Sequence, residues 1–100
     1  MEFDPVKDEL NWIFHRIHLS TAALVFADPY RVERLDDSEG NTSGEERIQI
    51  LGKVDKVLFV VCTERGEKTR LISARLANAA EKRIYYGNDT DNDKGWAKAD

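Results

Sequence analysis

The chain has 100 residues, one cysteine, and 15 Lys or Arg against 19 Asp or Glu, which gives a formal net charge of −4. That length accommodates one domain with a modest core, and the composition is that of a folded, soluble protein. The acidic balance argues against binding of nucleic acid by bulk charge alone. A single cysteine cannot form an internal disulfide, the first residues lack a signal-peptide pattern, and no apolar run is long enough to span a membrane. We therefore expect a cytoplasmic protein without membrane attachment.

The first part of the chain has the pattern of two helices. Asp4 followed by Pro5 is a strong helix start, because aspartate accepts first-turn amide hydrogens and proline suits the first helical position. The predicted helix covers residues 5–16 and carries an apolar stripe that we expect to pack on the sheet: Val6, Leu10, Ile13, Phe14 and Ile17. Ser20 is expected to cap a second short helix over residues 21–26.

Four segments have the alternation or the apolar run of β-strands: residues 30–35, 47–51, 56–63 and 69–74. The second of them is expected to end at Gly52, and the last two are joined by a hairpin turn at residues 65–67. The third strand is the most apolar and belongs at the sheet centre. Cys62 lies within it and is therefore expected to be a buried core residue rather than a nucleophile.

Two polar segments interrupt or follow these elements. Residues 36–44 form a polar, turn-rich loop, and residues 88–100 are polar apart from Trp96. We expect the second segment to be a disordered tail, so that the domain spans residues 1–87.

A last helix is predicted from a capping box, in which Asn78 is followed three residues later by Glu81, and the helix stops at Gly87. The predicted order is then two N-terminal helices, a four-stranded antiparallel sheet and a C-terminal helix. This is an α+β fold with helices laid on one sheet face.

Positive charge gathers in one stretch of the chain. Residues 63–86 carry six Lys or Arg against three Asp or Glu, and Arg65, Arg70 and Arg75 lie around the predicted hairpin. An arginine fork suits phosphate oxygens, so these residues are candidates for an anion site. The alternative is that they pair on the surface with nearby acids, namely Glu64, Glu67 and Glu81. Arg70 and Arg75 are an odd interval apart and share one face only if the strand ends or bends between them.

The residues allow RNA cleavage without a metal, which needs a base, an acid and cations that steady the phosphoryl charge. The chain has no His, Cys and carboxylate cluster at metal-ligand spacing, no Gly-rich phosphate loop and no serine-hydrolase elbow. We therefore expect neither a metal nor another cofactor.

Several motifs occur in order along the chain: Phe3-Asp4-Pro5, Asn11 with His15, Phe26 to Pro29, Glu45-Glu46-Arg47 closing on Gly52, Thr63-Glu64-Arg65, and Arg70-x-Ile72-Ser73-Ala74-Arg75-x-Ala77-x-x-x-Glu81-x-x-x-Tyr85. Together they resemble the BrnT family of ribonuclease toxins from bacterial type II toxin-antitoxin pairs. The most specific piece is Ile72-Ser73-Ala74-Arg75 with Glu81 downstream. The resemblance implies a compact relative of the RelE-type toxins.

The resemblance further implies a metal-independent endoribonuclease that inhibits translation. It implies a ribbon-helix-helix antitoxin similar to BrnA as the partner, with DNA bound only through the toxin-antitoxin complex. The implied catalytic residues are His15, Glu46, Arg65 and Arg70. The implied substrate-binding residues are Arg47, Ser73 and Arg75.

Individual roles follow from residue chemistry and from the family pattern. His15 can act as a base or an acid near neutral pH. The alternative to a catalytic role is that it interacts favourably with the dipole at the C-terminal end of the helix. By resemblance, Glu46 takes the base or orienting role and Arg47 contacts phosphate. Arg65 and Arg70 rank ahead of Arg75 as phosphate ligands, because Arg70 and Arg75 point to opposite sides of a regular strand. Arg75 is expected either to fix the last helix or to join the site from the sheet edge.

The chain also departs from the family pattern. Where members usually carry a Lys-His-Gly turn, it reads Phe14-His15-Arg16, and the usual Trp before the Asp-Pro pair is absent. Loss of the lysine removes a cation from the implied active surface. The alternative function is therefore a catalytically weakened interaction module of the same fold that binds an antitoxin-like partner. A DNA-binding protein acting alone fits least, because the chain has no recognition-helix pattern.

Overall fold

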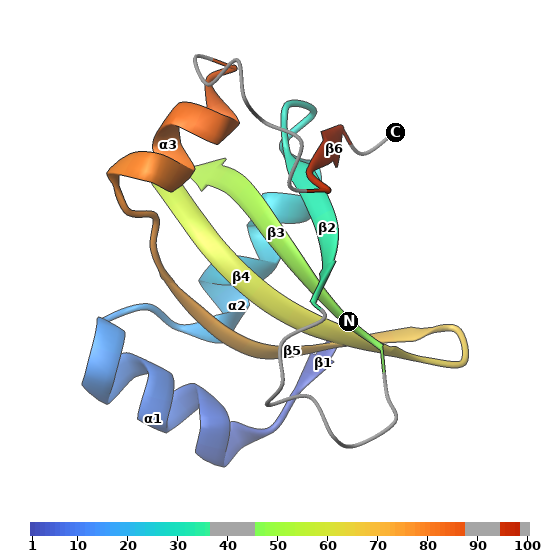
Figure 1. Cartoon of the computed structure of the whole chain (residues 1–100). Helices are drawn as coiled ribbons and strands as arrows, with labels where there is room; N and C mark the ends of the chain where they lie inside the picture. The colour runs from blue at the N-terminus through green and yellow to red at the C-terminus, as the bar shows by residue number, and fades with distance from the viewer. Residues whose placement is uncertain (37–45, 88–94, 99–100) are drawn as a thin grey trace.

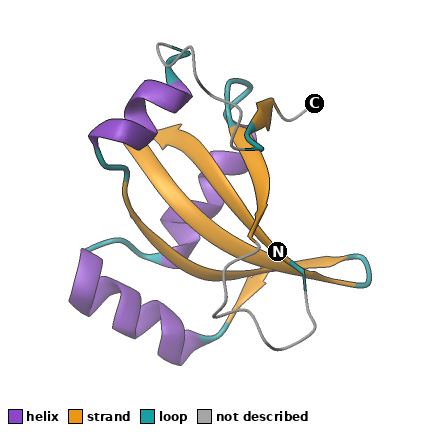
Figure 2. Ribbon diagram, viewed as in Figure 1, coloured by secondary structure: helices purple, strands orange, loops and turns teal. Residues whose placement is uncertain are grey.

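A mixed six-stranded sheet with helices on both faces forms the described part of the protein (Figure 1, Figure 2). The computed structural model describes residues 1–36, 46–87 and 95–98, apart from the side chain of Arg65. The strands are β1 Glu2–Phe3, β2 Val32–Asp36, β3 Arg47–Val54, β4 Lys56–Arg65, β5 Lys68–Leu76 and β6 Ala97–Lys98. The helices are α1 Pro5–His15, α2 Leu19–Ala22, the 3-10 helix η1 Ala23–Ala27 and α3 Ala79–Tyr85. The strand order is β1-β5-β4-β3-β2-β6.

The expected four-stranded antiparallel sheet is wrong, because the described residues form six strands and one pair is parallel. β1 runs parallel to β5, with Glu2 opposite Arg70 and Phe3 opposite Leu71. β6 runs antiparallel to β2 at the other edge. Each added strand has only two residues, so neither contains the alternation from which a strand is predicted.

The four central strands lie where the sequence predicted them, but β3 does not end at Gly52. It continues to Val54, and the chain reverses at Asp55, whose φ is 65°. A Cβ atom at Gly52 would lie 2.7 Å from the Cβ of Val25, which is closer than packed atoms approach. Glycine is therefore required here because η1 crosses β3 at close range.

The two helices before the sheet begin as their hydrogen bonds dictate. The Asp4 side chain accepts from the Val6 N–H at 2.8 Å, which confirms the predicted start of α1. The predicted Ser20 cap is wrong. α2 already begins at Leu19, whose N–H donates at 2.7 Å to Asp8 on α1. A cap supplied by another helix leaves no local sequence signal.

Helix α1 is oriented opposite to the prediction. Its apolar stripe was expected to pack on the sheet, yet Val6, Leu10, Ile13 and Phe14 are exposed and Asn11 is the buried residue. The Asn11 side chain accepts from the Ala74 N–H at 3.0 Å and donates to the Ile17 carbonyl at 2.7 Å. These bonds hold the polar side of α1 against the edge of β5, so the apolar side points outward.

Two hydrophobic cores lie on opposite faces of the sheet. On the inner face, buried residues of β3, β4 and β5 pack against α2 and η1; they include Leu19, Val25, Ile50, Val60 and Leu71. Cys62 is 1% exposed in this core, as predicted, and burial together with Glu33 and Glu64 raises the pKa of its thiol to about 12. The core on the outer face lies under α3 and contains Val32, Leu51, Val57, Ala77 and Trp96.

The end of the chain returns to the sheet. The capping box of α3 is confirmed, since Asn78 and Glu81 each accept from the other's backbone N–H at 2.8 Å, and Gly87 follows with a φ of 75°. Trp96, in the segment expected to be disordered, is buried beside Arg34. The rest of that segment, residues 88–94 and 99–100, lies outside the described residues, as does the predicted loop from residue 37 onward.

Candidate functional site

A β-bulge in β5 decides which residues share a sheet face. Val61 of β4 is opposite Ser73, whereas the next residue, Cys62, is opposite Leu71, so Ile72 is an extra residue in β5. An extra residue shifts the alternation of side chains by one position. Arg70 and Arg75, five residues apart, therefore point to the same face. Arg70 and Arg75 can therefore share a site because of the bulge, and not because the strand ends between them.

The outer face of the sheet carries an arginine cluster, which we define as Arg34, Arg47, Arg70 and Arg75. Across three strands, Arg47 pairs with Thr63, and Thr63 pairs with Arg70. Gln49, Val61 and Ser73 form the adjacent row. Since neighbouring strands lie about 4.8 Å apart, Arg47 and Arg70 begin about 10 Å from each other.

Arg70 is weakly held within the described part of the chain. Its Nε lies 3.9 Å from a carboxylate oxygen of Glu2, and the Arg70 side chain is 37% exposed. The same Nε is buried and has no hydrogen-bond acceptor there. A buried donor without a partner is costly, and the exposed part of the Arg70 side chain is the part that is accessible to an anion.

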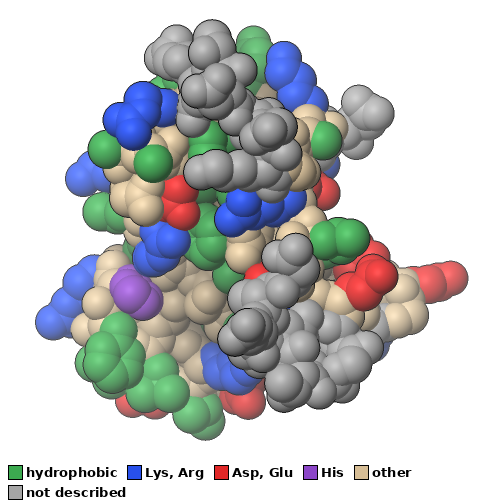
Figure 3. All heavy atoms as spheres, in the orientation of Figure 1, with side chains coloured by type: hydrophobic (Ala, Val, Ile, Leu, Met, Phe, Trp, Pro, Cys, Tyr) green, Lys and Arg blue, Asp and Glu red, His purple; other side chains and the backbone are tan. Residues whose placement is uncertain are grey.

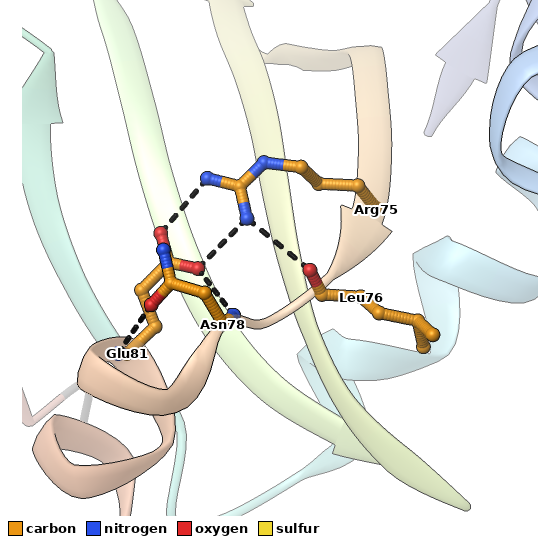
Figure 4. Close-up of polar contacts among 4 residues, drawn as sticks. All are labelled: Arg75, Leu76, Asn78 and Glu81. Atoms are coloured by element: carbon orange, nitrogen blue, oxygen red, sulfur yellow. Dashed lines mark hydrogen bonds and ion pairs between the residues drawn. The ribbon is translucent and has the colours of Figure 1, made fainter.

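Arg75, in contrast, is fully engaged (Figure 4). Its two terminal nitrogens donate to the two carboxylate oxygens of Glu81 at 2.7 and 2.9 Å, and its guanidinium lies 4.2 Å from the centre of the Phe59 ring. Burial alone would raise the pKa of the Glu81 carboxyl, but the hydrogen bonds from Arg75 and the Asn78 N–H, with the Arg75 and Arg34 charges, hold it below its ordinary value. Arg75 thus joins β5 to α3, which is the alternative considered for it.

Arg47 begins β3 and Glu46 precedes it, one strand away from Arg70 across β4. The Glu46 side chain is exposed, and its carbonyl accepts from the buried Thr63 hydroxyl at 2.7 Å. Arg47 is half-buried. The hydrogen bond from Thr63 fixes the backbone from which both side chains project.

His15 is exposed at the end of α1, beside the sheet edge. It lines a shallow depression with Ser73, Ile72, Phe14 and other residues of α1. The structure therefore places His15 and Ser73 on the lining of one depression, at the border of the outer face. Arg65 ends β4, with its backbone paired to Lys68, and its side chain lies outside the described part.

Sequence reasoning missed Arg34 as a member of the cluster and Gln49 as its neighbour. Arg34 donates to the Gln49 side chain at 2.7 Å and lies 4.4 Å from the centre of the Trp96 ring. The alternation in residues 30–35 places Arg34 on the same sheet face as Val32, two residues earlier. It did not show which strand lies beside it, since that depends on strand register.

A second polar network ties the far end of the sheet together. Asp28 accepts from the N–H groups of Tyr30 at 2.9 Å and Lys53 at 2.7 Å, and from the Tyr85 hydroxyl at 2.5 Å. Burial and the bond to Asp28 raise the pKa of Tyr85. A surface depression of the described part adjoins this network and includes Leu24 and Tyr86, but none of the predicted site residues lines it.

The described residues also bear on metal binding and on membrane insertion. No three His, Cys, Asp or Glu residues there are grouped as a metal ion would require. Within the same residues, every helix is too short or too polar to cross a membrane.

Comparison with models of protein families identifies a family to which the chain is similar. The model of the family described as "Ribonuclease toxin, BrnT, of type II toxin-antitoxin system" matches residues 3–81. The matched range contains α1, the four central strands and the arginine cluster. A comparison with curated proteins finds no match.

Proposed function

Because the chain belongs to the family of BrnT ribonuclease toxins of type II toxin-antitoxin systems, we propose that it is a metal-independent endoribonuclease whose outer sheet face binds RNA. Cleavage by this toxin inhibits translation, and a ribbon-helix-helix antitoxin similar to BrnA neutralises it. DNA is bound only by the complex of the two. The observation that carries the proposal is the bulge at Ile72, which places Arg70 and Ser73 on the face that also carries Arg47.

The proposed reaction needs little more than these side chains. Arg70 and Arg47 contact the phosphate and stabilise the charge that builds on its oxygens, with Arg65 contributing from the end of β4. Glu46 takes the proton of the 2'-hydroxyl or orients that group, and His15 exchanges a proton with the reacting oxygens. Ser73 donates a hydrogen bond to the RNA backbone, and Arg75 stabilises the face from its bond with Glu81.

The direct test is cleavage of a single-stranded RNA by the purified protein in the presence of EDTA. We expect cleavage to persist, Arg70→Ala to reduce its rate about 10²- to 10³-fold, and Arg70→Ala with His15→Ala to abolish it. Arg83→Ala, which removes an exposed arginine of α3, is the matched control and should cleave within about twofold of the wild type. Unchanged cleavage by the double variant would refute the assigned site.

The second candidate is a weakened interaction module, and the engagement of Arg75 favours it, because one arginine of the cluster is already neutralised by Glu81. Growth arrest on expression, relieved by the adjacent antitoxin gene, supports the toxin. A harmless chain that still binds the product of that gene supports the module.

A further inference from the structure

The outward face of α1 carries a continuous apolar stripe, which we define as Val6, Leu10, Ile13 and Phe14. The exposed fractions of these residues are 62%, 46%, 53% and 74%. In the space-filling view, hydrophobic side chains gather at the lower left of the molecule, over α1 (Figure 3). Helix geometry places residues at this spacing on one side.

This exposure is built into the fold. Asn11 is bonded to Ala74 and Ile17, and Asp8 to the Leu19 N–H, so three hydrogen bonds fix the polar side of α1 inward. Turning the helix to bury its stripe would leave the buried Ala74 N–H without an acceptor. Specific hydrogen bonds thus hold apolar side chains at the surface. Such an exposed apolar surface indicates an interaction site for a partner.

The size of the stripe helps to identify that partner. If a fully exposed large side chain has an accessible area of about 150–200 Å², the exposed fractions of the four stripe residues correspond to an apolar area of roughly 400 Å². A stable interface covers about 800 Å² on each partner. A second copy that pairs α1 with α1 alone would therefore be too small an interface, and the occupant must extend beyond the stripe.

The adjoining surface shows where it extends. Leu10 and Phe14 line the same depression as His15 and Ser73, so the stripe leads directly to the outer face. That face is basic at Arg70 and Arg47. A complementary partner therefore has apolar residues at helical spacing that contact the stripe, followed by carboxylates that contact the basic face.

We propose that the stripe is the docking site for an amphipathic helix of the antitoxin, whose acidic residues continue past Ser73 to the arginine cluster and exclude RNA. The helix lays its apolar side on α1 as helix-in-groove ligands do. This inference rests on the proposed RNA face, and it adds the surface and the chemistry of the inhibitory contact.

The test measures, by calorimetry, the binding of a purified ribbon-helix-helix antitoxin that neutralises this chain in cells. Ile13→Glu is expected to weaken binding at least about tenfold, because a carboxylate would enter an apolar contact. The matched control is Leu24→Glu, since Leu24 is 57% exposed on the separate depression near Tyr86; binding should stay within about twofold. Equal binding by the wild type and Ile13→Glu would overturn the proposal.

Two further readouts separate this inference from its alternatives. Free Ile13→Glu should unfold at the wild-type temperature and cleave RNA at the wild-type rate, since Ile13 is exposed and contacts no proposed RNA ligand. RNA cleavage by this variant should continue when the antitoxin is added. If the wild type does not cleave RNA at all, the proposed function is refuted, but the result of the binding measurement still stands. If the isolated chain sediments as a dimer that Ile13→Glu dissociates, the occupant is a second copy and the proposal fails.

Discussion

Gly52 shows how much one missing side chain matters in this protein. Its Cα lies so close to η1 that an added methyl group would meet Val25 at 2.7 Å. We expect Gly52→Ala to lower the free energy of unfolding by about 2 kcal/mol, because the inner core must shift to admit the atom. Urea denaturation measures this, with Ser20→Ala as the control.

Ser20→Ala should change stability by less than about 0.5 kcal/mol, because the Ser20 side chain does not cap α2. A loss as large as that of Gly52→Ala would show that the cap assignment is wrong. A neutral Gly52→Ala would show that η1 yields without cost.

Asp28 gives a pH dependence whose sign follows from its bonds. Burial would raise the pKa of its carboxyl, but the bonds from Tyr85, Tyr30 and Lys53, with the Arg31 charge, hold it below its ordinary value of 3.8. A lowered pKa stabilises the fold above that ordinary value, and the contribution is lost as the pH falls through the folded pKa.

We expect Asp28→Asn to cost about 2 kcal/mol at pH 7, because the amide nitrogen cannot accept from the donors now bonded to the carboxylate. The difference from the wild type should shrink as the pH falls from about 5 to 2. Thermal unfolding at stepped pH measures it, and a constant difference would contradict the role given to Asp28. Tyr85→Phe, which removes one of the three donors, should cost less.

At the scale of elements, α1 is attached to the sheet through Asn11. Asn11→Ala is expected to lower the free energy of unfolding by about 2 kcal/mol, because the Ala74 N–H would be buried without an acceptor. Asn11→Asp keeps that acceptor but places a buried carboxylate against the Ile17 carbonyl oxygen, so it should cost at least as much. Hydrogen exchange at the Ala74 amide reports the contact directly, and unchanged exchange in Asn11→Ala would count against it.

The elements also show what the sequence could and could not predict. The four central strands, the start of α1 and the capping box of α3 were predicted, because alternation and capping are local signals. β1 and β6 were not, because two residues carry no period and their pairing is tertiary. The amphipathic pattern of α1 was real, but which side it buries was decided by the bonds of Asn11 to distant backbone groups.

For the candidate site, too, the sequence predicted some features and not others. The residue types and the basic stretch were visible in the sequence, whereas the bulge at Ile72 was not, since no glycine or proline marks it. Without the bulge, Arg70 and Arg75 are assigned to opposite faces. The position of Arg34 beside Gln49 depends on strand register, which composition does not fix.

At the scale of the whole molecule, a chain with net charge −4 is proposed to bind a polyanion through a local basic face. Binding of a single-stranded RNA by the His15→Ala variant should weaken with salt, with a slope of log K against log salt of about −0.7 per phosphate neutralised. Arg70→Ala in the same background should reduce the magnitude of that slope by about 0.7. Arg83→Ala should leave it unchanged, and equal effects of the two substitutions would show that binding is not local.

The carboxamide of Asn11 has a consequence for the protein in concentrated solution. Beyond its two-residue pair with β1, β5 is the last strand on its side of the sheet, and such a margin invites another chain to add a strand of its own. The Asn11 oxygen takes the Ala74 N–H that a newcomer would need, and the body of α1 lies across the approach. The Asn11 side chain and α1 therefore hinder the addition of another strand along this margin.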